Sequence, residues 1–184
     1  MKILSIVFSI LIATSVCSAE TFIVDANGST KYLTIQSAVD AASSGDEISV
    51  MPGTYTGSND EVVYIGNKNL TIVATDGKES TFIDGGGLRR CIRIDDSDVT
   101  IQGFTIKNGY LNYETHNDAL GAGIRIEGNT ANNIWFDSCD IKNNLSADDN
   151  NYSSRGGGCF SDNVNILFSY CDFTNNTASM GGAF

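Results

Sequence analysis

The sequence predicts an all-β solenoid, in which short strands form coils that stack along one axis, with a short capping helix at the amino end. An alternation of apolar and polar residues recurs from Val99, from Ile134 and from Ile166, and a glycine-rich element recurs between these copies. Self-similarity at a period of about 20–50 residues is typical of stacked repeat architectures. A single helical pattern, placed before the repeats, predicts the cap.

Length and charge narrow the possible functions. The 184 residues suit one domain. The 11 lysines and arginines stand against 22 aspartates and glutamates, which gives a formal net charge of −11. Binding to nucleic acid or to an anionic membrane needs clustered Lys and Arg, so we expect neither partner. Hydrophobic residues make up 41% of the chain, enough to support a packed core.

Residues 1–19 have the features of a signal peptide. Lys2 precedes an apolar stretch at residues 3–13, and Cys17-Ser18-Ala19 forms a small-x-small cleavage site before Glu20. The stretch is too short for a spanning helix, which needs about 20 apolar residues, and no other segment is apolar enough to cross a bilayer. We therefore expect an exported mature chain, residues 20–184, that is secreted or held at the cell surface.

The alternating copies predict strands with one buried face, because successive side chains of a strand point to opposite sides. Two inward columns follow from this pattern, one of Ile106, Ile141 and Phe173, the other of Ile92, Ile124, Cys159 and Ala183. The unequal offsets between copies indicate loops that leave the coils at 110–120 and 145–155. An antiparallel β-sandwich stays open as the competing fold.

Punctuating residues mark the corners of the predicted coils. Asn108, Asn143 and Asn175 each end a strand, where asparagine tolerates the left-handed backbone region. The glycines at 121, 156 and 181 precede strands and allow sharp turns without the penalty of a Cβ atom.

The segment before the repeats predicts the cap. Apolar residues at 35, 38, 39 and 42 have helical spacing, with Thr34 as N-cap and Gly45 as the stop. A solenoid needs an atypical first unit to cover the open end of its core, and we assign residues 20–55 to this cap and the first coil. Further strands are expected at 21–24, 47–51, 69–74, 80–84 and 91–95.

Residues 22–25, 33–39 and 45–55 resemble the start of right-handed parallel β-helix proteins of the pectin-lyase-like superfamily. The repeats extend the resemblance over most of the mature chain. Phe173-Thr-Asn-Asn176 with Gly181-Gly-Ala183 is also similar to the F-x-x-N and G-G-A repeats of polymorphic outer-membrane proteins. The resemblance implies a right-handed parallel β-helix solenoid with a short N-terminal capping helix. It leaves the activity open, since the superfamily holds lyases, hydrolases, esterases, epimerases and adhesins.

The activity motifs of this superfamily are not found. The sequence has no N-T-D, G-H-G or R-I-K block of a polygalacturonase and no Q-D-T-L-like block of a pectin methylesterase. Two functions therefore stay open. One is an exported binding or adhesion module, with glycans as candidate partners. The other is a polysaccharide-processing enzyme, such as a lyase that acts on uronic-acid polymers. Whether the chain is an enzyme is left undecided.

Two sets of residues are candidates for binding. Arg93 and Arg125 occupy equivalent repeat positions, and stacked guanidinium groups could hold the carboxylate of a uronic acid. Phe160 and Phe184 continue the same predicted column and could form a sugar-stacking strip. The alternative is that all four are ordinary surface side chains.

Acidic turns are candidate calcium sites, because calcium takes several oxygen ligands. The first turn holds Asp95, Asp96 and Asp98, and the second holds Asp148 and Asp149. The alternative, which the net charge favours, is that these turns are part of a solvated acidic surface. No cofactor other than calcium is indicated.

The cysteines of the mature chain are Cys91, Cys139, Cys159 and Cys171, and the single histidine is His116. Without a C-x-x-C pair or further histidines, a zinc site is not expected. Cys139 and Cys171 share a predicted column, where strand spacing suits either a disulfide or a reduced buried stack. Export permits disulfides.

The carboxyl end lies within a predicted strand, at Phe184. We expect the chain to be part of a longer gene product, in which a membrane barrel or further coils could follow. An uncapped coil exposes unpaired strand edges, so self-association through this end is also expected.

Overall fold

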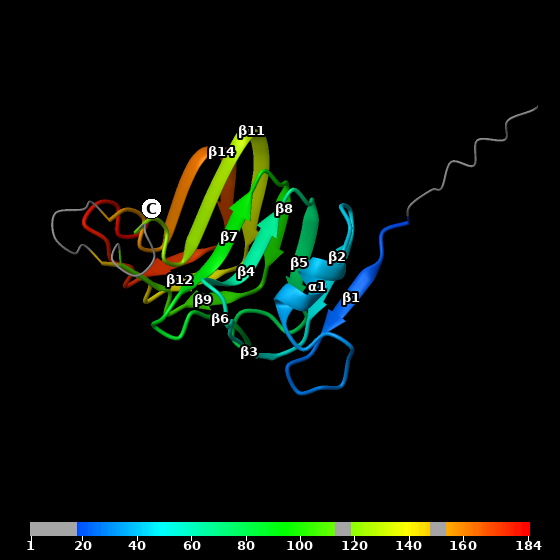
Figure 1. The fold of residues 1–184 in the computed structure, drawn as a ribbon. Coiled ribbons are helices and arrows are strands. Elements are labelled where there is room, and N and C mark those ends of the chain that lie inside the picture. Colours follow the sequence, from blue (N-terminus) through cyan, green and yellow to red (C-terminus); the bar gives the residue numbers. More distant parts are fainter. Residues whose placement is uncertain (1–17, 113–118, 148–153) are drawn as a thin grey trace, which may run out of the picture.

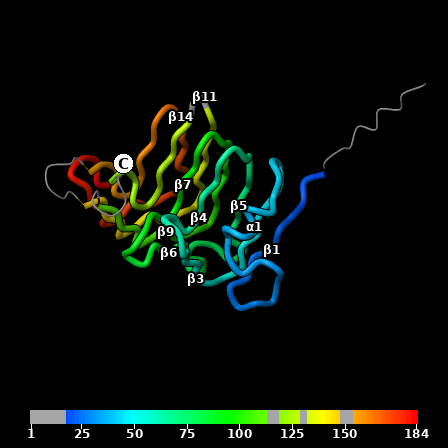
Figure 2. The backbone as a smooth tube through the Cα atoms, viewed as in Figure 1, coloured from blue at the N-terminus to red at the C-terminus, as the bar shows by residue number. Residues whose placement is uncertain are grey.

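The computed structural model describes residues 18–112, 119–147 and 154–184, apart from the side chains of 129–131. The chain winds as a right-handed parallel β-helix, and all pairings between the described strands are parallel. Figures 1 and 2 show the coils stacked from the helical cap toward the carboxyl end. The predicted fold class is confirmed, and the parallel pairing excludes the antiparallel sandwich.

Three faces surround the core. The first face consists of β4 (Glu61–Gly66), β7 (Arg90–Asp95) and the first parts of β11 (Ile124–Asp137) and β14 (Cys159–Ser169). The second face consists of β1 (Thr21–Val24), β2 (Glu47–Val50), β5 (Leu70–Ala74), β8 (Val99–Gln102) and the last parts of β11 and β14. The third face consists of β3 (Gly53–Tyr55), β6 (Thr81–Asp84), β9 (Thr105–Lys107), β12 (Asp140–Lys142) and β15 (Asp172–Thr174).

Two short strands outside the predicted repeats form a separate sheet after the third face. β10 (Tyr110–Leu111) pairs with β13 (Leu145–Ser146) at the start of the segments expected to be loops. β4 also lies outside the strands expected from sequence. β11 and β14 bend from the first face into the second, with a register shift between Glu127 and Asn132. Each long strand therefore helps to build two faces.

The cap is α1 (Ile35–Ala41), and Thr34 is its N-cap as predicted: the Thr34 hydroxyl accepts a hydrogen bond from the Ser37 N–H at 3.1 Å. Ile35, Ala38 and Val39 are buried against the first coil. The predicted stop at Gly45 is wrong, because Ala42 is the C-cap and has an extended backbone. Gly45, with a φ of 97°, instead makes the turn into β2. In the described part of the chain no helix has the length and apolar character of a membrane span.

Stacked apolar side chains form the core. The first predicted column is confirmed: Ile106 and Ile141 are fully buried and in register, and Phe173 follows Ile141. The second is confirmed for Ile92, Ile124 and Cys159, which are also in register and fully buried.

The second column is wrong by one residue at its end. The Cys159 N–H donates to the Ala183 carbonyl at 3.0 Å, as the Ile124 N–H donates to the Gly158 carbonyl at 3.0 Å. Phe184, not Ala183, therefore follows Cys159 in the inward column. Its ring lies 5.8 Å from that of the core residue Phe168.

The corners use the left-handed backbone as predicted. Asn108, Asn143 and Asn175 have φ values of 55°, 57° and 55°. Gly121 and Gly156 have φ values of 66° and 57°, and a Cβ at either position would overlap a backbone carbonyl. These residues allow the chain to turn sharply at the corners of each coil.

The residues that follow two of these corner asparagines, Asn144 and Asn176, are hydrogen-bonded to each other, and we call them the asparagine ladder. Asn144 is fully buried, and its Oδ1 accepts from the Gly109 N–H at 2.8 Å. Its Nδ2 donates to Oδ1 of Asn176 at 2.9 Å, and Nδ2 of Asn176 donates to the Ile141 carbonyl at 2.8 Å. The second asparagine of each Asn-Asn pair thus satisfies backbone groups that the turn removes from the sheet.

Candidate functional site

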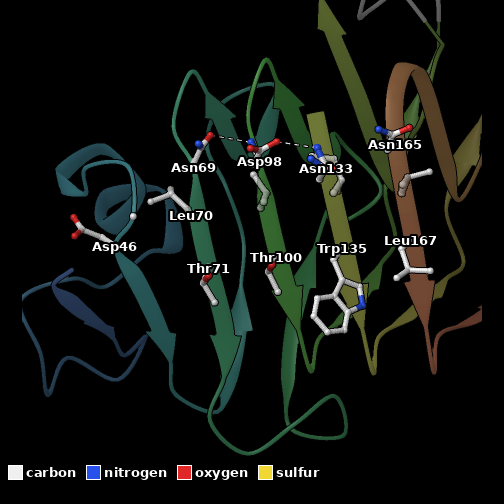
Figure 3. A pocket seen from close by; sticks show the side chains of 14 residues that line it. Asp46, Asn69, Leu70, Thr71, Asp98, Thr100, Asn133, Trp135, Asn165 and Leu167 are labelled. Atoms are coloured by element: carbon white, nitrogen blue, oxygen red, sulfur yellow. Dashed lines mark hydrogen bonds between the residues drawn. The ribbon is translucent and has the colours of Figure 1, made fainter. Parts of the chain in front are cut away.

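A groove of about 540 Å³ crosses the outer side of the second face, over β5, β8, β11 and β14 (Figure 3). The strand register places two rows of side chains along the groove, and each coil contributes one residue to each row. The first, which we call the Asx row, is Asn69, Asp98, Asn133 and Asn165; the second, the tryptophan row, is Thr71, Thr100, Trp135 and Leu167. Residues from four coils thus lie side by side.

Backbone hydrogen bonds hold the Asx row in place. The Asp98 N–H donates to Oδ1 of Asn69 at 2.9 Å, and the Asn133 N–H donates to Oδ1 of Asp98 at 2.8 Å (Figure 3). Within the described residues, the side-chain amides of Asn133 and Asn165 form no hydrogen bond to protein. These amides line the groove and can both donate to and accept from a ligand.

Trp135 is the largest exposed side chain of the groove. Its register partners are Thr100 on one side and Leu167 on the other. Trp135 is 45% exposed and Leu167 is 58% exposed, although both lie within strands of the sheet. An indole offers a flat apolar surface together with one N–H donor, so the row combines stacking area with threonine hydroxyls.

The charges at the groove are negative. Asp46 and Asp98 line it, and no lysine or arginine does so among the described residues. The buried Asp46 carboxylate accepts hydrogen bonds from the backbone N–H groups of Glu20 at 2.8 Å and Ser43 at 2.7 Å. These two hydrogen bonds lower the pKa of Asp46, so its charge anchors the amino end of the fold.

Arg93 and Arg125 are in register on the outer side of the first face, as the sequence predicts. Tyr64 precedes them in this column, with the Arg93 guanidinium 5.6 Å from its ring centroid, and Phe160 follows. Phe184 does not continue the column, so the predicted strip of Phe160 and Phe184 is wrong. The one-residue shift in the last coil turns Phe184 inward.

Carboxylates hold both guanidinium groups. Arg93 lies 2.8 Å from Asp95, and Arg125 lies 2.7 Å from Glu127. Burial acts to lower the pKa of Arg93, but the hydrogen bond and charge of Asp95 outweigh it, and the pKa lies above its ordinary value. Both arginines are therefore neutralised locally, and an incoming carboxylate would have to compete with those of the protein.

The predicted calcium residues diverge. Asp95 faces Arg93, and Asp98 belongs to the Asx row. Asp95 and Asp96 instead border a hollow of about 320 Å³ that is also lined by Glu127 and Asp162. Among the residues that the structure describes, no three Asp, Glu, His or Cys side chains are grouped so as to hold one metal ion. Calcium binding at this corner stays a prediction.

The four described cysteines are free thiols. Cys139 and Cys171 occupy equivalent positions in adjacent coils, because the residues after them, Asp140 and Asp172, are register partners. His116, Asp148 and Asp149 lie outside the described residues, as do residues 1–17.

The groove was not expected from the sequence, although the sequence contains a signal for it. Each member of the Asx row is followed directly by an inward apolar residue: Leu70, Val99, Ile134 and Ile166. This Asx–apolar pair recurs once per coil at the corner between the first and second faces. Comparison of the chain with protein-family models, with curated proteins and with solved structures finds no match.

Proposed function

We propose that the protein is an exported binding module that takes up a polysaccharide chain in the groove of the second face. The observation that carries this proposal is the exposed indole of Trp135, which lies in line with the hydroxyl groups of Thr71 and Thr100 and beside the amides of Asn133 and Asn165. Sites for small polar ligands combine apolar lining with a few placed polar groups, and the groove has this composition.

Sugar chemistry matches both rows. The C–H face of a pyranose ring packs on an aromatic side chain, while its hydroxyls need partners that donate and accept, as Asn and Thr do. Each strand adds one residue to each row, at a spacing of about 4.8 Å, so successive units of a linear glycan can each contact one member of each row along the solenoid axis. A repeating surface of this kind suits a repeating polymer.

Charge favours a neutral glycan over a uronic-acid polymer. The groove contributes the carboxylate of Asp98, and the whole chain has a formal net charge of −11. Such a field repels polyanions unless a divalent cation intervenes. Arg93 and Arg125 lie on the first face and are held by their own carboxylates, so they do not offset this repulsion within the groove.

The test is binding of a panel of soluble polysaccharides, neutral and uronic, by isothermal titration calorimetry and affinity electrophoresis. We expect a neutral glycan to bind and Trp135→Ala to weaken it by about tenfold or more, as truncation of a central aromatic contact does. Tyr64→Ala is the matched control, because Tyr64 is a similarly exposed aromatic on the first face. Equal losses in the two variants, or binding unaffected by Trp135→Ala, would refute the groove as the site.

Export is part of the proposal, and one contact supports it. Glu20, the first residue after the predicted cleavage site, donates its backbone N–H to the buried Asp46 carboxylate at 2.8 Å. Cleavage after Ala19 would turn this N–H into an α-ammonium group, and the hydrogen bond into an ion pair. Amino-terminal sequencing of the secreted product should give Glu20 as its first residue; a product that keeps residues 1–19 would contradict the assignment.

A second part of the proposal is that the protein self-associates through its last described coil. The inward residues Phe168 and Phe173 are half-buried, whereas Phe136 and Ile141, their counterparts one coil earlier, are fully buried. Strands β14 and β15 also end their sheets in the described chain. We expect a second copy to add to these edges. Concentration-dependent mass in light scattering is the expected result, and a monomer at all concentrations would argue against it.

A further inference from the structure

The third face holds two thiols in a position to react with each other. Cys139 precedes β12 and Cys171 precedes β15, and the Asp172 N–H donates to the Cys139 carbonyl at 3.0 Å. The two cysteines are therefore neighbours across one parallel strand pair, with their Cα atoms separated by about 4.8 Å. This separation lies within the range of disulfide-bonded cysteines, roughly 4.4–6.8 Å.

Both side chains point the same way. The Cys139 thiol contacts the carbonyls of Asp137 at 3.3 Å and Ile101 at 3.7 Å. Cys171 makes the equivalent contacts one coil later, with Ser169 at 3.3 Å and Phe136 at 3.5 Å.

We propose that Cys139 and Cys171 form a disulfide that ties two adjacent coils together when the protein meets a low-molecular-weight disulfide such as oxidised glutathione. Strand spacing places the Cβ atoms about 4.8 Å apart, and disulfides need roughly 3.5–4.5 Å. The coils must therefore approach by roughly 0.3–1.3 Å. The half-buried setting of Cys171 in the last described coil allows this movement.

The order of the steps follows from burial. Cys171 is half-buried and Cys139 is fully buried, so Cys171 meets the oxidant first. The neighbouring Cys139 lowers the pKa of Cys171 below that of an ordinary thiol, which favours the thiolate that attacks. The Cys171 thiolate attacks one sulfur of oxidised glutathione and releases one glutathione thiolate. Cys139 then loses its proton and attacks Sγ of Cys171, which releases the second. Two protein thiols and one oxidised glutathione thus give one protein disulfide and two glutathione thiols.

The other two cysteines provide matched controls. Cys91 and Cys159 are fully buried, and burial raises the pKa of both, for Cys91 to about 12. Neither is a register partner of another cysteine: Cys159 pairs with Ile124, and the Cys91 N–H bonds to the Ala122 carbonyl.

The experiment equilibrates the full folded chain with a glutathione redox buffer, blocks remaining thiols with N-ethylmaleimide and maps the peptides by mass spectrometry. We expect one cross-link, between Cys139 and Cys171, and a rise of roughly 5–10 °C in Tm on oxidation. Cys139→Ser should stop at a mixed disulfide of Cys171 with glutathione. Cys91→Ser and Cys159→Ser should still form the cross-link.

Two results would overturn the proposal. One is that Cys139 and Cys171 both remain open to the blocking reagent after equilibration in oxidising buffer. The other is that Cys171 stops at the glutathione adduct in the unaltered chain. The peptide map of the unaltered chain decides between these outcomes even if Cys139→Ser fails to fold, and Cys139→Ala provides a second variant whose fold is checked by circular dichroism.

Discussion

Substitution of Asn144 by alanine should destabilise the fold far more than the loss of an ordinary surface asparagine would. Asn144 is fully buried, and its amide bonds the Gly109 N–H, the Ile106 carbonyl and Asn176. Alanine at this position leaves the Gly109 N–H without a partner, at a cost of about 1–3 kcal/mol, and removes a further hydrogen bond of about 0.5–1.5 kcal/mol to Asn176. The free energy of unfolding should therefore fall by about 2–4 kcal/mol.

Urea unfolding followed by circular dichroism measures this change. With a slope near 2 kcal/mol/M, the midpoint should fall by about 1–2 M while the slope stays the same. Asn143→Gly is the matched control, because Asn143 is exposed and has a φ of 57°, which glycine adopts readily. We expect its midpoint to move by less than about 0.3 M. A similar shift in both variants, or a shift under about 0.5 M for Asn144→Ala, would refute the assignment of the ladder as a stabilising element.

Asp46→Asn should lower Tm at pH 7 and flatten the pH dependence of Tm below about pH 4. The reason is that the pKa of Asp46 in the folded protein lies below its unfolded value near 3.9. The stability that the ionised carboxylate contributes is therefore present above the unfolded value and is lost as the pH falls through the folded pKa. Thermal melts from pH 2 to pH 7 measure this, and an unchanged profile would contradict it. Gly123→Ala should cost about 2–3 kcal/mol in urea unfolding, because the added Cβ would overlap the Gly158 carbonyl of the next coil, which cannot move aside without breaking the ladder; a neutral effect would show that the coils are looser than described. The 184-residue chain should not cleave polygalacturonate or alginate, with or without calcium, because Arg93 and Arg125 are held charged by carboxylates and cannot serve as a base. Ultraviolet detection of unsaturated sugars tests this, and product that either Arg→Ala substitution abolishes would make the protein a lyase.

Period-two alternation predicted the inward columns correctly because burial acts on every strand. A slip of one residue would move a whole set of apolar side chains into water. Ile106 and Ile141 could therefore be placed in one column from the sequence alone. The same reasoning failed in the last coil, because Ala183 and Phe184 are both apolar and no alternation chooses which of them faces inward.

The left-handed corners could also be predicted from residue type. Asn108, Asn143 and Asn175 occur where few other side chains tolerate a positive φ. The neighbouring Asn144 and Asn176 gave no such signal. Their role depends on backbone groups from the coil before and on the space left by Gly109, and neither is encoded near them in the chain.

The sequence by itself determined the stacked coils, the cap and the stacking of Arg93 on Arg125, because hydrophobic burial and backbone sterics act locally and repeat in every coil. Only the tertiary structure decided what the outer surface offers. It placed Asp98 and Trp135 in one groove and paired the guanidinium of Arg93 with the carboxylate of Asp95. Outward side chains need not be buried, so the apolar pattern of the sequence does not show which of them are neighbours. Their neighbours are decided by the turns at the corners, which set the register of one coil against the next.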